Sequence, residues 1–427
     1  MNYSETLEYL FTSTPSFQQV GADAYKPGLE RIEDFCSYLG SPHKNFPTIH
    51  IAGTNGKGST SHLIASVLMK AGYRVGLFTS PHLKDFRERV RVDGKMISEQ
   101  EVVEFVARHR EKMESLQLSF FEMTTAMAFD HFNRCDVEVA VIETGLGGRL
   151  DATNILRPMV SVVTNVGMDH TDLLGNTLKQ IAAEKAGIAK PRTALILGER
   201  SEEYDSVFAD RAAALQCPLI FAEEHFTADP TAEGGYTLRR KRDGREFALT
   251  LDLKGNYQQH NLVTAAAALD YLHTSTPLTI PRRAFIEGVE SAATTTHLAG
   301  RWQQLQQRPT VICDTGHNSH GIKYVARQLR ELQQSHQRLI CVIGFVRDKD
   351  VRQVLELMPR EAHYIFTAPA TQRALPAEEL ARLATLSGLC GEVCPTATEA
   401  LAEAKKIATA DDAIFIGGSN YLVAEII

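Results

Sequence analysis

The sequence predicts an α/β protein of two domains, and three observations carry this prediction. Short continuous apolar runs, such as VEVAVI at 137–142 and MVSVVT at 159–164, alternate with helical segments. Continuous apolar strands between helices are typical of a parallel sheet that is covered on both faces. The alternation stops near residue 298 and then begins again. The length of 427 residues also exceeds that of one ordinary domain.

The first half of the chain supplies the elements of the larger domain. The predicted strands are 47–52, 74–79, 137–142 and 159–164, and the predicted helices are 59–71, 121–134, 177–189 and 257–273. Between them, residues 217–254 show short alternating segments with the turn pairs Gly234-Gly235 and Asp243-Gly244. This pattern predicts antiparallel hairpins at a sheet edge.

A stretch rich in Thr, Ala and Gly at about 292–300 is the expected linker. After it we expect strands at 309–313, 338–343, 363–367 and 412–416, and helices at 319–335, 350–358, 376–386 and 397–408. The predicted domains are therefore 1–297, with a parallel sheet and a phosphate-binding loop (P-loop), and 298–427, a smaller Rossmann-like α/β domain.

Composition excludes several classes of function. The net charge of −7 gives no general attraction to nucleic acid. No stretch approaches the roughly 20 apolar residues that span a bilayer, and the N-terminus lacks the pattern of a secretory signal. The seven cysteines are scattered, so a zinc site at Cys390 and Cys394 is disfavoured against reduced thiols. We expect a cytoplasmic protein without nucleic-acid or membrane partners.

Residues 52–60 (AGTNGKGST) follow a predicted strand and precede a predicted helix. A phosphate-binding loop requires this context, because glycines allow the backbone N–H groups to approach the phosphates and the helix N-terminus favours negative charge. The general Walker pattern fails, since Ile51 stands at its first Gly and Gly58 at its Ser or Thr. A plain packing turn is the structural alternative.

Polar residues follow two of the apolar strands. Glu143 ends one strand, and Asp169, His170 and Asp172 crowd the segment after the next. Ligands of open parallel sheets gather at such carboxyl ends. Carboxylates at these positions indicate a metal site, although a lone histidine is more often structural. Ser80, in TSPHLKDFRERVR at 79–91, has the alternative of a simple Ser-Pro turn.

Further motifs occur along both halves. They are KPGLER at 26–31, SFFEMTT at 119–125, GLGGRLDATN at 145–154, EKAGIA at 184–189, NLVTAAAAL at 261–269, GRWQ at 300–303, ICDTGHN at 312–318, IGFVRDKD at 343–350 and IGGSNY at 416–421. Each has a structural alternative when taken alone: Phe120 and Phe121 as core, Lys185 as a helical surface residue, and Asn261 as a helix cap or interhelix hydrogen bond.

Taken together and in this order, the motifs resemble the Mur ligase superfamily, and in particular its folylpolyglutamate synthase and dihydrofolate synthase branch. The resemblance spans residues 1–427. It implies an ATP-binding and pterin- or folate-binding ligase domain at 1–297 and a C-terminal ligase domain at 298–427. One departure concerns Lys26 and Pro27, where an acidic and an aliphatic residue are common, and this bears on dihydrofolate synthase activity.

The resemblance also implies site residues, cofactors and a modification. The implied magnesium ligands are Ser80, Glu143 and His170. The implied catalytic residues are Lys57, Lys185, Arg301 and His317, and Lys185 is expected as N6-carboxylysine. The implied nucleotide-binding residues are Asn55, Gly56, Lys57, Gly58, Ser59, Asn261, Arg301 and Asp314. The implied substrate-binding residues are Gly28, Phe121, Glu122, Leu150, Asp151, Ala152 and Ser419. Asp348 and Lys349 match a typical Asp-Lys pair. The cofactors are ATP and Mg²⁺, with K⁺ as a further candidate.

The expected reaction adds L-glutamate to dihydropteroate, to folate polyglutamates, or to both, through an acyl phosphate made from ATP. The expected enzyme is a monomeric ATP-dependent carbon–nitrogen ligase with small-molecule substrates. Folylpolyglutamate synthase activity alone is the first alternative. A cell-wall precursor ligase, a P-loop phosphotransferase or NTPase, and a non-catalytic nucleotide-binding module are more distant alternatives.

Overall fold

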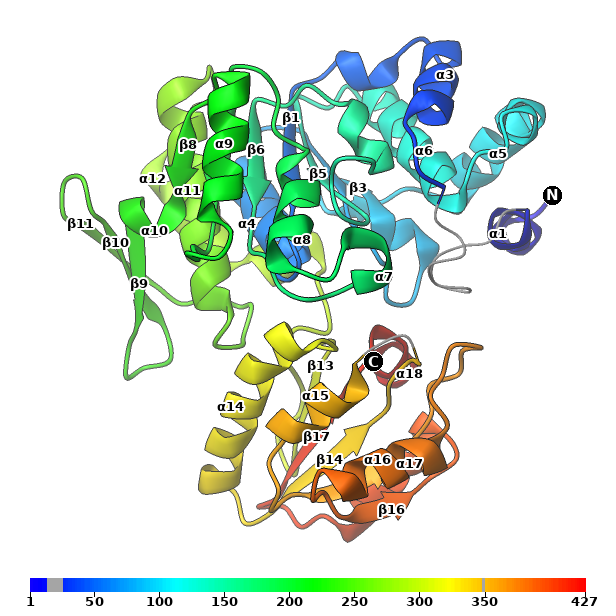
Figure 1. Ribbon diagram of the computed structural model, residues 1–427, viewed down its shortest axis with the longest axis vertical. Coiled ribbons are helices and arrows are strands. Elements are labelled where there is room, and N and C mark those ends of the chain that lie inside the picture. Colours follow the sequence, from blue (N-terminus) through cyan, green and yellow to red (C-terminus); the bar gives the residue numbers. More distant parts are fainter. Residues whose placement is uncertain (14–25, 348–349) are drawn as a thin grey trace. The chain divides into compact units, whose positions relative to one another are not determined.

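The computed structural model describes residues 1–13, 26–347 and 350–427 of the chain. It divides into two compact units, which are coloured blue to yellow-green and yellow to red in Figure 1. Unit 1 comprises residues 1–13, 26–252 and 258–298, and unit 2 comprises Leu253–Tyr257 and Ala299–Ile427. No helix of the described part combines the length and the apolar composition needed to cross a membrane.

Unit 1 is built on an eight-stranded sheet in the order β4-β3-β2-β5-β1-β6-β7-β8. The strands are β1 (Thr48–Ala52), β2 (Val75–Phe78), β3 (Val90–Val92), β4 (Lys95–Met96), β5 (Val139–Glu143), β6 (Val160–Val163), β7 (Ala194–Leu197) and β8 (Leu219–Phe221). The strands from β2 to β8 in this order are parallel, whereas β3 and β4 are antiparallel. The continuous apolar runs correspond to the central strands, every residue of which is buried.

Helices cover both faces of this sheet, as the continuous apolar strands predict. The helices of unit 1 are α1 (Tyr3–Thr12), α3 (Glu30–Tyr38), α4 (Lys57–Lys70), α5 (Glu99–Ser115), α6 (Phe120–Arg134), α7 (Thr171–Leu174), α8 (Leu178–Ala186), α9 (Asp205–Leu215), α10 (Ala222–His225), α11 (Gln258–Ser275), α12 (Arg282–Glu290) and α13 (Ala292–Thr296). One core packs α3, α5 and α6 against β2 and β5, and another packs α8 and α9 against β6 and β7. Helix α4 packs against α11 and α12 (Figure 1).

The antiparallel hairpins predicted in 217–254 are present, but their expected place at a sheet edge is wrong. Strands β9 (Phe226–Pro230), β10 (Tyr236–Arg240) and β11 (Arg245–Leu249) form a separate three-stranded sheet, and only β8 joins the large sheet. Gly234 and Gly244 have φ angles of 79° and 69° in the two turns. The left-handed backbone required there favours glycine.

Unit 2 contains a six-stranded sheet in the order β12-β13-β17-β14-β15-β16, in which only β12 is antiparallel. Its strands are β12 (Gln303–Gln306), β13 (Thr310–Asp314), β14 (Leu339–Ile343), β15 (His363–Phe366), β16 (Gly391–Val393) and β17 (Ala413–Gly417). Its helices are α14 (Ser319–Ser335), α15 (Val351–Leu357), α16 (Ala377–Leu386), α17 (Ala397–Ile407) and α18 (Asn420–Ile426). The predicted α/β alternation after residue 298 is thus confirmed.

Three expectations about local structure need correction. The stretch expected to be a linker is helical at Ala292–Thr296. The helix expected at 177–189 ends at Ala186. Asn261, for which a helix cap was one alternative, lies inside the first turn of α11, which begins at Gln258.

Candidate functional site

The phosphate loop connects β1 to α4 in unit 1. Gly56 caps α4 with a φ of 78°, and Lys57 is the first residue of the helix. The Lys57 ammonium donates to the carbonyls of Gly53 and Thr54, at 3.2 and 3.4 Å. The lysine is therefore folded back over the loop, at a helix N-terminus where anions are stabilised.

Neighbouring segments hold this loop in place. The backbone N–H groups of Thr54 and Asn55 donate to the Asn165 carbonyl and to Asn165 Oδ1, at 3.1 and 2.9 Å. The Thr164 hydroxyl donates to the Asn55 carbonyl at 2.6 Å. A loop fixed in this way presents its remaining N–H groups in a set arrangement, which favours binding of a phosphate.

Two glycines of the loop cannot carry a side chain. A Cβ at Gly56 would lie 2.1 Å from Asn261 Oδ1, and a Cβ at Gly53 would lie 1.8 Å from Thr164 Oγ1. Asn261 also donates to Gln258 Oε1 at 2.8 Å. The structure thus brings Asn261 of α11 against the loop, although the two are far apart in the sequence.

Polar side chains lie beside the loop, at the carboxyl ends of the parallel strands. Glu143 ends β5, which pairs directly with β1, and its side chain is only 3% exposed. The Ser80 N–H donates to Glu143 Oε2 at 3.1 Å. The hydroxyl of the next residue, Thr144, is buried and has no hydrogen-bond partner among the described residues. A buried carboxylate and an unpaired hydroxyl fit a site for a cation or another polar ligand.

His170 follows β6, the other neighbour of β1. It adopts a left-handed φ of 50° and caps α7, and Asp169 Oδ1 accepts its backbone N–H at 2.9 Å. The imidazole Nε2 lies 3.8 Å from Asp169 Oδ2. Strands β5, β1 and β6 are consecutive in the sheet, so Glu143, the phosphate loop and His170 follow three adjacent carboxyl ends.

Lys185 is the most unusual residue near the loop. It lies on α8 and is 2% exposed, so the alternative of a surface lysine is wrong. Burial, together with the positive charge of Lys57, lowers the pKa of Lys185 to about 7, while Asp169 and Glu184 oppose the shift. An amine with this pKa is about half neutral at pH 7, against roughly one in 3,000 for an ordinary lysine.

An aromatic and polar wall stands next to Glu143. The Phe121 ring lies against Gly145, because a Cβ there would be 2.5 Å from its Cζ. Asp151 is buried, and its carboxylate accepts from Leu146 N at 2.8 Å and from Thr153 N at 3.0 Å. Burial raises the pKa of Asp151, against these hydrogen bonds. Phe120, by contrast, belongs to the core.

The remaining residues of the predicted substrate site lie close in the chain or in space. Leu150 is half-buried and Ala152 is buried beside Asp151. Gly28 has a φ of 112°. The Glu122 carboxylate caps α6, where it accepts from Ser119 N at 2.7 Å.

Arg31, the last residue of the KPGLER motif, was not among the predicted site residues but contacts one of them. Its Nε lies 3.1 and 3.3 Å from the two oxygens of Glu122, and its Nη2 donates to the Lys26 carbonyl at 2.8 Å. It therefore ties the segment that contains Gly28 to the start of α6. The position of Arg31 three residues after Gly28 was the only signal in the sequence.

We expect Arg31→Ala to lower the free energy of unfolding by about 1–3 kcal/mol, because it leaves the buried Glu122 carboxylate without its cation. Arg31→Lys should recover only part of the loss, since a lysine lacks the planar fork of donors. Chemical denaturation measures both. Arg110→Ala, which breaks an exposed pair with Glu114, is the matched control and should change stability much less than Arg31→Ala. Equal losses in the two alanine variants would contradict the role of Arg31.

Unit 2 holds a second polar cluster around Asp314, at the end of β13. Asp314 is buried and accepts from Tyr257 Oη at 2.5 Å, from Trp302 N at 2.8 Å and from Gly316 N at 2.7 Å. Burial raises the pKa of Asp314, while the charge of Arg301 opposes the shift. His317 Nδ1 lies 3.0 Å from the Thr315 carbonyl.

Ser419 follows β17, the strand that pairs with β13, with Asp314 opposite Gly417. Its hydroxyl accepts from Leu422 N at 3.1 Å and caps α18, so a capping role is evident. Asp348 and Lys349 lie outside the described residues.

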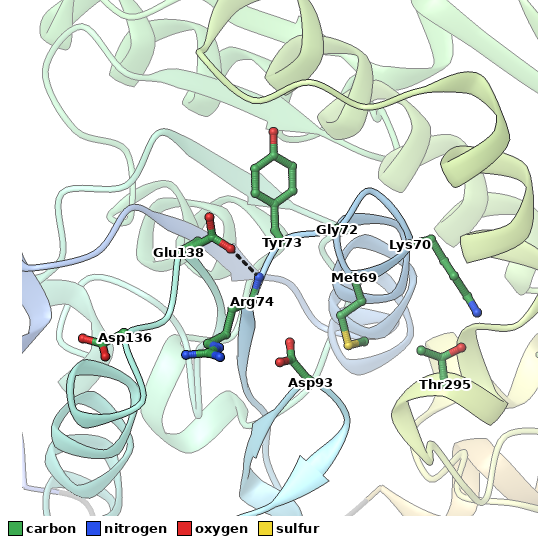
Figure 2. A pocket seen from close by; sticks show the side chains of 9 residues that line it. All are labelled: Met69, Lys70, Gly72, Tyr73, Arg74, Asp93, Asp136, Glu138 and Thr295. Carbon is green, nitrogen blue, oxygen red and sulfur yellow. Dashed lines mark hydrogen bonds between the residues drawn. The ribbon is translucent and has the colours of Figure 1, made fainter.

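A pocket of about 670 Å³ opens at the other end of α4 (Figure 2). Its lining includes Lys70, Arg74, Asp93, Asp136 and Glu138. These residues flank the amino ends of β2 and β5, whereas the phosphate loop lies at the carboxyl ends. Helix α4 has 14 residues from Lys57 to Lys70, which correspond to about 20 Å along its axis. The pocket is therefore separate from the candidate site.

Comparisons with known proteins identify the family of the chain. The Mur ligase middle domain matches residues 51–269, and the Mur ligase glutamate ligase domain matches residues 300–420. The dihydrofolate synthase/folylpolyglutamate synthase of Bacillus subtilis is 32% identical over 417 residues, which cover 94% of each chain. A probable bifunctional folylpolyglutamate synthase/dihydropteroate synthase of Halobacterium salinarum is 34% identical over 94% of this chain. The chain spans about half the length of that relative (49%) and of its Haloferax volcanii counterpart (50%).

Solved structures give the same result. Escherichia coli FolC in complex with DHPP and ADP is 32% identical and has a TM-score of 0.87, and the match covers 100% of this chain and 97% of that one. A bifunctional folylpolyglutamate synthase/dihydrofolate synthase of Yersinia pestis, complexed with AMPPNP and Mn ion, is 28% identical with a TM-score of 0.86, covering 100% and 97%. By family domains, by sequence and by fold, the chain belongs to the folylpolyglutamate synthase/dihydrofolate synthase branch of the Mur ligase superfamily.

Proposed function

We propose that this protein is an ATP-dependent ligase that joins L-glutamate to dihydropteroate and to folate polyglutamates through an acyl phosphate. The observation that carries the proposal is that the phosphate loop and the buried Glu143 follow the carboxyl ends of adjacent parallel strands, with the buried Lys185 close enough to Lys57 to feel its charge. The similar FolC and Y. pestis structures, with ADP or AMPPNP, DHPP and Mn ion, support it.

Activation of the acid is the first step. A carboxylate is a poor acyl donor, because its leaving group would be oxide. The acid oxygen therefore attacks the γ-phosphorus of ATP, which forms an acyl phosphate and releases ADP. Lys57 and the N–H groups at the start of α4 neutralise the transferring phosphoryl group, and residues 55–59 form the rest of the phosphate cradle.

The divalent cation belongs to the same step. Ser80, Glu143 and His170 would hold it, and oxygen ligands beside phosphate suit magnesium. When bound, the cation supplies positive charge to the phosphate oxygens. We place the carbamate at Lys185, because only a neutral amine reacts with carbon dioxide and burial provides that form. The carbamate would turn a buried cation into an anion next to Lys57.

Substrate positioning follows from the wall beside Glu143. A flat pterin ring suits the face of Phe121, and Asp151, with its neighbours Leu150 and Ala152, offers polar and apolar contacts near it. Gly28 and Glu122 complete this set, and Arg31 positions both. From unit 2 we include Arg301 and His317 as phosphate ligands, Asp314 as a ribose ligand and Ser419 as a glutamate-side residue; Asn261 is the nucleotide contact of α11.

Amide formation completes the reaction. The glutamate amine attacks the acyl carbon, a tetrahedral intermediate forms, and phosphate leaves. The protein acts mainly by positioning the reactants and neutralising charge. The proposal includes a monomeric, cytoplasmic enzyme that acts on small molecules only, with K⁺ as a further candidate cation.

The deciding experiment measures phosphate release with ATP, magnesium and glutamate, comparing 7,8-dihydropteroate, a reduced folate and no pterin, with the amide identified by mass. Turnover with both acids is expected. Turnover with folate alone would restrict the protein to folylpolyglutamate synthesis, which would indicate that Lys26 and Pro27 exclude dihydropteroate. Phosphate release that needs no pterin and yields no amide would instead identify an NTPase.

A further inference from the structure

A second group of metal-binding side chains lies on α5 and α6. One ligand atom each from Glu101, His131 and Cys135 lies within 4.8 Å of the other two. His131 lies in the last turn of α6 and Cys135 is the residue that caps it, so the two lie about one turn apart on the same side. His131 is ten residues beyond Phe121, about 15 Å along the helix. The cluster is therefore distinct from the residues of the proposed ligase site.

Each of the three side chains is held near the same point. Glu101 Oε2 accepts from Ser98 N at 3.0 Å and from Ser98 Oγ at 2.7 Å, as part of the capping box of α5. Its other oxygen, Oε1, lies 3.4 Å from His131 Nδ1. Cys135 Sγ lies 3.9 and 3.8 Å from the two ring nitrogens, so a rotation of the imidazole is needed to aim one of them at a shared ion.

The ligand types select the kind of ion. Thiolate, imidazole and carboxylate together suit zinc, whereas magnesium prefers oxygen ligands alone. Burial lowers the pKa of His131, while the Glu101 carboxylate opposes the shift. A neutral imidazole offers a lone pair to a metal ion. Burial and the Glu101 carboxylate raise the pKa of the Cys135 thiol, while Arg134 and Arg74 oppose the shift, so it is a bound ion that would favour the thiolate. The negative charges of a thiolate and a carboxylate would together balance the two positive charges of a divalent ion.

We propose that Glu101, His131 and Cys135 bind a zinc ion with an open fourth position for water, and that this ion fastens α5 to α6. His131 is buried, whereas Glu101 and Cys135 are half-buried. An ion can therefore reach the cluster from solvent. This inference does not depend on the proposed ligase function.

The experiment titrates metal-free protein with cobalt(II), which replaces zinc and gives a charge-transfer absorption only when a thiolate is bound. A second titration measures zinc affinity by competition with a chromophoric chelator. We expect one equivalent of cobalt to produce the thiolate band and one equivalent of zinc to abolish it. The proposed magnesium ligands include no cysteine, so metal bound there gives no such band.

Variants test the three ligands. Cys135→Ser should remove the band and weaken zinc binding by about 100-fold or more. Glu101→Gln should weaken it by about tenfold, because glutamine still serves in the capping box but is a poor ligand. Cys394→Ser, at a half-buried cysteine of unit 2, is the control and should behave like the unaltered protein.

Excess zinc should also raise the melting temperature of the unaltered protein and of Cys394→Ser, but not that of Cys135→Ser. A cobalt spectrum without a thiolate band, or equal zinc affinities for the unaltered protein and Cys135→Ser, would overturn the proposal. Either result would mean that the protein binds an adventitious ion only.

Discussion

Lys57→Ala is expected to slow amide formation by about 10²–10³-fold, because it removes a preorganised cation from the transferring phosphoryl group. The structure gives the physical reason: the ammonium is folded back over Gly53 and Thr54, where α4 begins. A steady-state assay with saturating ATP measures this loss in kcat. We also expect weaker nucleotide binding, which appears separately as a higher KM for ATP.

Lys70→Ala is the matched control for this variant. Lys70 lies on the same helix but at its exposed end, beside the pocket of Figure 2. Its replacement should leave kcat unchanged. If both variants kept the full rate, Lys57 would not be the cation that acts on the phosphoryl group.

Lys185→Met should reduce activity by a similar factor of about 10²–10³, because it removes the group that can carry a carbamate. The same substitution should increase the stability of the folded protein, although it lowers activity. The folded-state pKa of the unmodified amine is about 7, below its ordinary value of 10.5. Between these values the unfolded chain binds more protons, so an unmodified Lys185 makes stability rise with pH across this range and penalises folding fully below it. The variant should therefore have a higher melting temperature at pH 6.

The carbamate itself can be observed by ¹³C NMR after incubation with labelled bicarbonate. As pH falls below about 7, Lys185 becomes protonated, so the carbamate signal and the activity should fall together. Lys179→Ala, on the exposed side of the same helix, should change neither. An unmodified Lys185 in a fully active enzyme would contradict the proposed carbamate.

Continuous apolar runs predicted the central strands well, because burial on both faces leaves a strong pattern at 137–142 and 159–164. The place of residues 226–249 was not predictable in this way, since alternation shows that strands pair but not which sheet they join. Helix α5 was missed although Ser98 and Glu101 form a capping box that the sequence displays. Its many charged residues hide the apolar face of the helix.

The site was only partly predictable for a related reason. The motifs brought out the loop, Glu143 and Lys185, but the burial of Lys185 depends on tertiary packing. The contact between Arg31 and Glu122 joins residues 91 positions apart. The cluster of Glu101, His131 and Cys135 likewise needs α5 and α6 to be packed together. No local sequence pattern predicts such contacts between distant residues.

The small sheet of β9, β10 and β11 has a consequence for self-association. An unpaired edge strand is a template for pairing with another chain. Strand β11 is such an edge, and it exposes Arg245 and Glu246. Glu246 is already paired with Arg239 of β10 at 2.7 Å. A second chain that added a strand here would have to strip water from these charges, so the edge discourages aggregation while the protein folds.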